Sequence, residues 1–337
     1  MTNEQGNGAP LQGEEAIIRI LAPLARGYPG AFGLEDDCAL IAPEPGTELV
    51  LKTDPVAEGV HFLADDAPED VAWKALAVNV SDLAAKGARP IGYLMALSFP
   101  APPAQGWLRR FAAGLDAAQA SFGCHLIGGD TDRRPGPLTI SITILGAVAA
   151  GRMVRRGTAC AGDALFVSGT LGDAALGLLL RRDPSLASAW GLSAAEAEHL
   201  ARRFRRPEPR LALGPALRAH ASAAMDLSDG LAKDLGRMCA ASGCGAQVRL
   251  ADVPLSPAAA KALAADPALA ARIVAAGDDY EVLAAVPPAA ADAFRAAAAA
   301  AGVTATRVGA ATAGTGVTIE GSDGRPLQLD RTGWDHF

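Results

Sequence analysis

Long hydrophobic runs are missing from this chain of 337 residues, and so is an excess of positive charge. No stretch approaches the roughly 18 to 20 uncharged apolar residues that a membrane-spanning helix needs. Residues 1–13 are polar and lack the apolar core of a secretory signal, so we expect a disordered lead-in and no secretion. The net charge of −7 argues against a nucleic-acid surface, which would be basic. We therefore expect neither a membrane nor a nucleic-acid partner.

Cysteine pairing and lysine-based nucleotide motifs are absent too. The five cysteines form no CxxC pair and no secreted disulfide framework, which is typical of a reduced, cytoplasmic protein. Cys38 has no base near it in the sequence, so we interpret it as a packing residue and not as a nucleophile. The five lysines never form a Walker A loop, and no protein-kinase motif is present. If the chain binds ATP, metal ions and backbone amides must do most of the holding.

Two domains are the default for this length, because a single core rarely extends beyond about 250 to 300 residues. Strands and helices follow one another up to about residue 150, and the same kind of series then begins again. We expect helices at 14–25, 68–85, 107–121, 174–180, 231–241 and 289–301. Strands are expected at 48–52, 91–99, 124–127, 138–148, 164–168, 222–226, 247–250, 280–286 and 303–308. The expected fold class is α+β, with domains at 14–150 and 151–337.

Aspartates near the ends of apolar segments are the most informative feature that is present. They are Asp36, Asp37, Asp54, Asp82, Asp130, Asp226 and Asp229. Most lie in short polar breaks between hydrophobic runs, where a rigid scaffold presents its functional groups. Gathered carboxylates repel one another unless a hard cation lies between them, and Mg²⁺ takes oxygen ligands of this kind. The pattern predicts a magnesium site that handles phosphate.

Several of these signals also have an ordinary structural interpretation. Asn79, Asp82 and Lys86 share one helical stripe, which is equally a solvated helix face. Ser228 or Asp229 would serve equally well as the N-cap of the helix that follows.

Two glycine-containing turns are candidates for phosphate binding. The glycines of Gly128-Gly129-Asp130 follow an expected strand and would let a phosphate approach the backbone amides. Gly169-Thr170-Leu171-Gly172 lies between a strand and a helix, where amides and the helix dipole favour an anion. Ordinary turns look the same, so both interpretations stay open. The arginines at 202–206, just before Pro207, are interpreted as a solvated helix end.

Taken together, several blocks resemble the thiamine-monophosphate kinase family. The blocks are Asp36-Asp37-Cys38-Ala39, 53–62 (TDPVAEGVHF), 74–85 (KALAVNVSDLAA), Gly128-Gly129-Asp130-Thr131, 226–231 (DLSDGL), Asp279-Tyr280-Glu281 and 333–337 (GWDHF). They follow one another from about Glu14 to the last residue. The aspartate-rich blocks are shared more loosely with the wider aminoimidazole-ribonucleotide-synthetase-like superfamily.

This resemblance implies a reaction in which ATP phosphorylates thiamine monophosphate to thiamine diphosphate, directly and with several Mg²⁺ ions. No catalytic general base is expected, because the acceptor is a phosphate monoester whose second pKa is about 6. The family also implies two α/β domains of the aminoimidazole-ribonucleotide-synthetase-like type. It implies a homodimer as well, in which the N-terminal sheets of two chains join into a barrel.

The resemblance assigns roles to particular residues. The implied metal ligands are Asp37, Thr53, Asp54, Asp82, Asp130, Asp226 and Asp229. The implied ATP contacts are Gly128, Gly129, Arg156 and Ser228, and the implied contacts to thiamine monophosphate are His61, Asp278 and Trp334. Trp334 suits a thiazolium cation, since an aromatic face attracts positive charge.

Three residues depart from the family pattern. Glu35 stands where glycine is common, Lys52 where a small hydroxyl residue often helps to hold a metal, and Asp278 where glutamate is more usual. An ammonium group cannot coordinate a metal ion. Two other functions stay open: a superfamily member acting on another substrate, such as an ATP-dependent synthetase, and a non-catalytic regulator that binds divalent cations or nucleotides.

Overall fold

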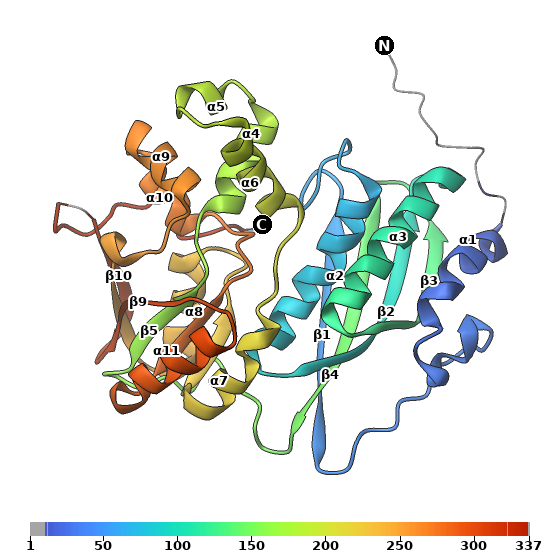
Figure 1. Ribbon diagram of the computed structural model, residues 1–337, viewed down its shortest axis with the longest axis horizontal. Helices are drawn as coiled ribbons and strands as arrows, with labels where there is room; N and C mark the ends of the chain where they lie inside the picture. The colour runs from blue at the N-terminus through green and yellow to red at the C-terminus, as the bar shows by residue number, and fades with distance from the viewer. Residues whose placement is uncertain (1–10, 12, 322, 336–337) are drawn as a thin grey trace. The chain divides into compact units, whose positions relative to one another are not determined.

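The computed structural model divides the chain into two compact units (Figure 1). It describes residues 11, 13–321 and 323–335. The first unit comprises the described residues up to Leu83 together with Arg89–Gly151, and the second comprises Ala84–Ala88 and the described residues from Arg152 onward. Most of the expected lead-in at 1–13 lies outside the described residues, as do His336 and Phe337.

The first unit is built on a four-stranded sheet in the order β1-β4-β2-β3. Its strands are β1 (Thr47–Ala57), β2 (Arg89–Phe99), β3 (His125–Arg133) and β4 (Thr139–Ala149). Both β1 and β2 run antiparallel to β4, whereas β3 is parallel to β2. The strands β1 and β3 are therefore the two edges, and no closed sheet forms within the described residues.

Helices cover one face of this sheet (Figure 1). They are α2 (Pro68–Ala85) and α3 (Gln105–Phe122), and α1 (Glu14–Leu21) continues into a 3-10 turn at Ala22–Ala25. Side chains alternate between the two faces of a strand, and Ile140, Ile142 and Ile144 of β4 are completely buried. The opposite face carries Leu51 and Leu94, which are 60% and 40% exposed. The sheet thus has one covered face and one partly open face.

The second unit contains a six-stranded sheet in the order β10-β7-β9-β5-β8-β6. Its strands are β5 (Ala164–Ser168), β6 (Ala223–Asp226), β7 (Gly245–Arg249), β8 (Val282–Val286), β9 (Ala305–Thr312) and β10 (Gly316–Glu320). Its helices are α4 (Asp173–Arg182), α5 (Leu186–Ala189), α6 (Ala194–Arg205), α7 (Gly214–His220), α8 (Leu231–Ser242), α9 (Pro257–Ala265), α10 (Leu269–Ala275) and α11 (Ala291–Ala300). Successive residues of β5 join two different apolar clusters, Leu165 and Val167 one and Phe166 the other. Both faces of this sheet are therefore packed.

Strand β1 is longer than the sequence pattern predicts. It was expected to end at Lys52, but it pairs with β4 as far as Ala57. Thr53 and Asp54 consequently lie inside the strand and take its alternating directions, instead of following it in a polar break.

Strand β3 also continues past its expected end at residue 127. It pairs with β2 through Gly128, Gly129 and Asp130, with a bulge just before them. A Cβ atom at Gly129 would lie 2.0 Å from the carbonyl oxygen of Met95. The glycine is thus required by the close approach of the neighbouring strand, and the expected turn is wrong. Among the described residues, no helix is long and apolar enough to span a membrane.

Candidate functional site

A lysine lies between two of the predicted metal ligands. The Nζ atom of Lys52 is 3.1 Å from Oδ2 of Asp54 and 3.1 Å from Oδ2 of Asp82. Lys52 and Asp54 are two positions apart on β1, so both point to the face that packs against α2, which carries Asp82. The two carboxylates converge on one position, and a cation occupies that position.

The electrostatics of this triad leave an excess of negative charge. Burial lowers the pKa of Lys52, but the charges of Asp82 and Asp54 outweigh burial, and the net effect raises it. The pKa of Asp54 is raised as well, because burial outweighs the favourable charge of Lys52 and Asp82 adds repulsion. One ammonium group does not balance two carboxylates, so the triad keeps a net negative charge.

Asn79 fixes the backbone of Asp54. The N–H of Asp54 donates to Oδ1 of Asn79 at 2.9 Å, and Nδ2 of Asn79 donates to the carbonyl oxygen of Asp54 at 3.4 Å. Since β1 is an edge strand, no strand of the described part of the chain pairs with these backbone groups on that side, and the carboxamide takes that place. Asn79 is completely buried, so the solvated-face interpretation is wrong for this residue.

The other predicted metal ligands of the first unit lie apart from this triad. The hydroxyl of Thr53 is on the opposite face, where it donates to the carbonyl oxygen of Ile142 and accepts from Thr143. Asp130 is exposed on β3, three strand spacings or roughly 14 Å from β1. Asp37 is exposed in the loop before β1. No group of three or more His, Cys, Asp or Glu side chains lies together as a metal site in the described part of the chain. The metal roles of these residues stay predictions.

His61 lies in the turn that follows β1. Its Nδ1 accepts a hydrogen bond from the backbone N–H of Ala57 at 3.0 Å. A neutral imidazole with this acceptor role carries its proton on Nε2, which is then the ring's donor.

In the second unit, two loops and the C-terminal segment meet. The backbone N–H of Asp278 donates to the carbonyl oxygen of Ser228 at 2.9 Å, and the N–H of Trp334 donates to that of Asp229 at 3.0 Å. Four of the predicted site residues, from three separate stretches of sequence, are therefore neighbours. The Trp334 side chain is 49% exposed, and Asp226 lies buried at the end of β6 nearby in sequence.

Cationic side chains hold Asp229. Its Oδ2 is 2.6 Å from Nη1 of Arg237 and 3.5 Å from Nζ of Lys233. The same Nη1 lies 3.0 Å from Oδ1 of Asp234, whose Oδ2 accepts from the N–H of Asp229 at 2.8 Å. Burial raises the pKa of Asp234 to about 6. Helix α8 begins after Gly230 without a side-chain cap, so the N-cap interpretation of Ser228 and Asp229 is wrong.

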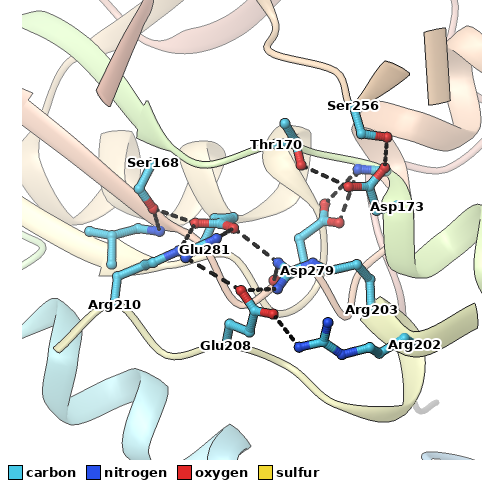
Figure 2. Close-up of polar contacts among 12 residues, drawn as sticks. Ser168, Thr170, Asp173, Arg202, Arg203, Glu208, Arg210, Ser256, Asp279 and Glu281 are labelled. Atoms are coloured by element: carbon cyan, nitrogen blue, oxygen red, sulfur yellow. Dashed lines mark hydrogen bonds and ion pairs between the residues drawn. The ribbon is translucent and has the colours of Figure 1, made fainter. Parts of the chain in front are cut away.

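A buried ion-pair network centred on Glu281 was not anticipated from the sequence. Its carboxylate is fully buried and accepts from Nη2 of Arg203 at 2.9 Å, Nε of Arg210 at 2.7 Å and Oγ of Ser168 at 2.6 Å (Figure 2). Arg203 is 6% exposed, so its interpretation as part of a solvated helix end is wrong. The sequence signal for this network is Glu281 itself, which belongs to the block Asp279-Tyr280-Glu281.

This network supports the segment that carries Asp278. Asp278 and Tyr280 have φ angles of 72° and 51°, a left-handed conformation that costs about 1 to 3 kcal/mol for residues other than glycine. Between them, Asp279 is buried, which raises its pKa, and its carboxylate accepts twice from the N–H of Gly172. Arg203 also donates to the carbonyl oxygen of Asp279 at 3.3 Å. These contacts hold Asp278 in a conformation that it would not favour alone.

The same contacts bear on the turn at 169–172. The N–H of Gly169 donates to the carbonyl oxygen of Thr304, and the N–H of Leu171 donates to that of Pro254. The N–H of Gly172 donates to the carboxylate of Asp279. Three of the four amides that would cradle a phosphate are thus engaged within the chain, which favours an ordinary turn.

Two further residues are at the surface. Arg156 is exposed, and its carbonyl oxygen accepts from Oγ of Ser242 at 3.2 Å. Cys38 is exposed as well, so its interpretation as a packing residue is wrong.

Comparisons with protein families agree with this two-unit architecture. Residues 35–148 match the AIR synthase related protein, N-terminal domain, and residues 161–322 match the AIR synthase related protein, C-terminal domain. These two matches together cover most of the chain and place it among the AIR synthase related proteins.

Individual relatives show which family within this class the chain belongs to. A thiamine-monophosphate kinase of Escherichia coli (strain K12) is 42% identical over 91% of this chain and 92% of its own length. That of Caulobacter vibrioides is 44% identical over 83% of this chain and 78% of its own. The crystal structure of thiamine-monophosphate kinase from Stenotrophomonas maltophilia has a TM-score of 0.80 and 37% identity, covering 94% of this chain and 98% of that chain. AaThiL complexed with AMPPCP and TMP has a TM-score of 0.75 and 30% identity, covering 96% and 97%. This chain belongs to the thiamine-monophosphate kinase family, which confirms the resemblance seen in the sequence.

Proposed function

We propose that this chain transfers the γ-phosphoryl group of ATP to thiamine monophosphate by a direct in-line reaction assisted by Mg²⁺, giving thiamine diphosphate. The observation that carries the proposal is the convergence of Asp54 and Asp82 on one cation position. The complex of AaThiL with AMPPCP and TMP supports the choice of substrates, because that protein aligns with nearly the whole of this chain.

The main physical obstacle to this reaction is the repulsion between two polyanions. Each pair of unit charges about 4 Å apart costs roughly 4 kcal/mol at an effective dielectric constant of 20. A catalyst for this transfer must therefore supply positive charge at the phosphates and hold the two substrates in line. The acceptor phosphate is already largely ionised near pH 7, so no general base is needed.

The donor chemistry of the chain suits Mg²⁺. The oxygen ligands that we assign are Asp37, Thr53, Asp54, Asp82, Asp130, Asp226 and Asp229. When bound, several Mg²⁺ ions would neutralise and align the phosphate oxygens of both substrates.

Other residues bind and orient the substrates. We assign Gly128, Gly129, Arg156 and Ser228 to ATP. Nε2–H of His61 is suited to donate to the acceptor phosphate, since Nδ1 is already an acceptor. The exposed ring of Trp334 offers a face to the thiazolium cation, and the neighbouring loop presents Asp278.

The open edges of the first sheet support a homodimer that closes a barrel. Both β1 and β3 are edges, and the face opposite the helices exposes Leu51 and Leu94. Pairing of β1, before Asp54 whose backbone is held by Asn79, with β3 of a second copy would bring the strands that carry Asp54 and Asp130 together. This arrangement accounts for predicted ligands that lie on opposite edges of one sheet. Light scattering of the purified chain should give the mass of a dimer, and Leu51→Glu should give a monomer.

We place the reaction in the cytoplasm. All five cysteines are free thiols, two of them exposed, as is usual for a protein of a reducing compartment.

Product analysis tests the proposed reaction. The purified protein is incubated with MgATP and thiamine monophosphate, and the thiamine species are separated by chromatography. Thiamine diphosphate should form from the monophosphate and not from free thiamine, and only when Mg²⁺ is present. ATP binding without diphosphate formation would instead indicate a superfamily member with another substrate, and nucleotide binding with no turnover of any kind would indicate a regulator.

A further inference from the structure

We propose that the ammonium group of Lys52 takes the place of one divalent metal ion between Asp54 and Asp82. The chain would then work with one fewer Mg²⁺ than it would have with a hydroxyl residue at position 52. This inference rests on the proposed function, because it concerns the metal ligands assigned there.

The geometry is that of a cation site occupied by a side chain. Lys52 is equidistant from the two carboxylates, at 3.1 Å from each, which is normal for a charge-assisted hydrogen bond. Neither carboxylate is fully exposed, the side chains of Asp54 and Asp82 being 39% and 22% exposed. The Lys52 side chain is 34% exposed, and its ammonium group contacts both carboxylates.

The backbone elements hold the side chains of Lys52, Asp54 and Asp82 in a fixed arrangement. Lys52 and Asp54 are held on the same face of β1 by its register with β4, where they pair with Ile144 and Ile142. The carboxamide of Asn79 holds the other edge of Asp54. Asp82 follows Asn79 by three positions on α2 and so lies on the same side of the helix. The three charged groups are thus brought together by rigid elements.

The charges of these three side chains determine which cations can bind between the two carboxylates. The two carboxylates carry −2 and the ammonium +1, so the triad keeps one net negative charge. A Mg²⁺ ion placed within ligand distance of both oxygens would lie next to the ammonium group and be repelled by it. The divalent ion at this position is therefore excluded, while ions ligated by the outward oxygens or by the other aspartates are still attracted.

Counting bound ions tests this directly. Mn²⁺ is titrated into the purified chain in the presence of AMPPCP, and free Mn²⁺ is measured by electron paramagnetic resonance. Lys52→Ser should bind one more Mn²⁺ per chain than the wild type. Lys52→Arg, which keeps a positive charge, should match the wild type. Lys261→Ser is the control for net charge, because Lys261 is half exposed and pairs with Glu196 in the second unit.

Thermal melting gives a second readout that needs neither substrate nor activity. In EDTA, Lys52→Ser should melt below the wild type, because two carboxylates then face each other without a counter-ion. Adding MgCl₂ should remove this difference. If Lys52 had only a structural role, the loss would persist in MgCl₂.

The outcomes separate this inference from the proposed function. Equal Mn²⁺ counts for the wild type and Lys52→Ser would overturn the inference, because the ammonium would then be moving aside for the metal. If the wild type forms thiamine diphosphate but binds as many Mn²⁺ ions as Lys52→Ser, only the inference about Lys52 is wrong. A wild type that forms no thiamine diphosphate defeats the proposed function, whereas one extra Mn²⁺ in Lys52→Ser would still support the role of Lys52.

Discussion

Arg203 and Glu281 lie 78 positions apart in the sequence and form a buried ion pair, with Nη2 of the arginine 2.9 Å from Oε1 of the glutamate. The pair joins α6 to the segment that carries Asp278 in a left-handed conformation. The shape of a predicted substrate-binding loop thus depends on a charge pair that lies beneath it.

Removal of Glu281 should strongly destabilise the second unit. Glu281→Ala leaves two arginines without their buried partner, and such a loss costs about 3 to 5 kcal/mol. The measurement is the free energy of unfolding in urea. Glu198→Ala is the matched control, since this exposed glutamate pairs with Arg205 at the surface and its loss should cost less than about 1 kcal/mol. Equal effects of the two substitutions would contradict the proposed role of the network.

Asp54→Asn and Asp130→Asn should each leave the fold intact and nearly abolish phosphoryl transfer. The amide keeps the size of the side chain but removes the negative charge that holds a metal ion. The expected loss in kcat is on the order of 10² to 10³. Asp132→Asn is the control, because Asp132 is exposed on the same strand as Asp130 and has no assigned role. Normal turnover of both variants with unchanged Mg²⁺ dependence would remove these aspartates from the metal site.

Mixing these two inactive variants tests the proposed dimer. If Asp54 of one chain acts with Asp130 of the other, a mixed dimer contains one site with both substitutions and one intact site. Co-expression should then restore roughly a quarter of the wild-type rate, since half of the dimers are mixed. A mixture as inactive as its components would show that each site takes both aspartates from a single chain.

Stability should depend on pH through Glu196 at the start of α6. The hydrogen bond from Lys261, followed by those from Ser193, lowers the pKa of Glu196 from its usual 4.5 to about 2. A carboxylate with a lowered pKa stabilises the fold above about pH 4.5, and this contribution is lost as pH falls toward 2. Glu196→Gln should therefore lower the melting temperature at pH 7, and the difference from the wild type should shrink between pH 4.5 and 2. A difference that stays constant over this range would exclude the charge of Glu196 as its cause.

The sequence was sufficient for most elements of the fold and for the family. The strand at 164–168 and the helix at 68–85 form with the predicted bounds, because apolar periodicity, Pro68 and the glycine at 87 mark their ends locally. The continuation of β1 and β3 could not be predicted, since both depend on strands that are distant in the sequence. Glycines that usually end a strand are tolerated in β3 because β2 lies close to them, with Leu94 next to Gly128 and Met95 next to Gly129.

The sequence predicts which residues form the candidate site, but it does not predict how they are arranged. Sequence spacing cannot show that the ammonium of Lys52 lies between Asp54 and Asp82. The sequence shows only that Lys52 departs from the family pattern. Sequence spacing also cannot show that the side chain of Asn79, three positions before Asp82, accepts a hydrogen bond from the backbone of Asp54 at the edge of β1. Pairings such as Arg203 with Glu281 have no sequence pattern, because they arise only when α6 lies next to the start of β8.

The most direct test of the proposed reaction is a single turnover with γ-labelled ATP, excess enzyme and thiamine monophosphate in Mg²⁺. Direct transfer predicts that the label lost from ATP appears in thiamine diphosphate at a one-to-one ratio, with none on the protein and none transferred in EDTA. Label retained on the protein, or released only as inorganic phosphate, would contradict direct metal-assisted transfer between the two substrates.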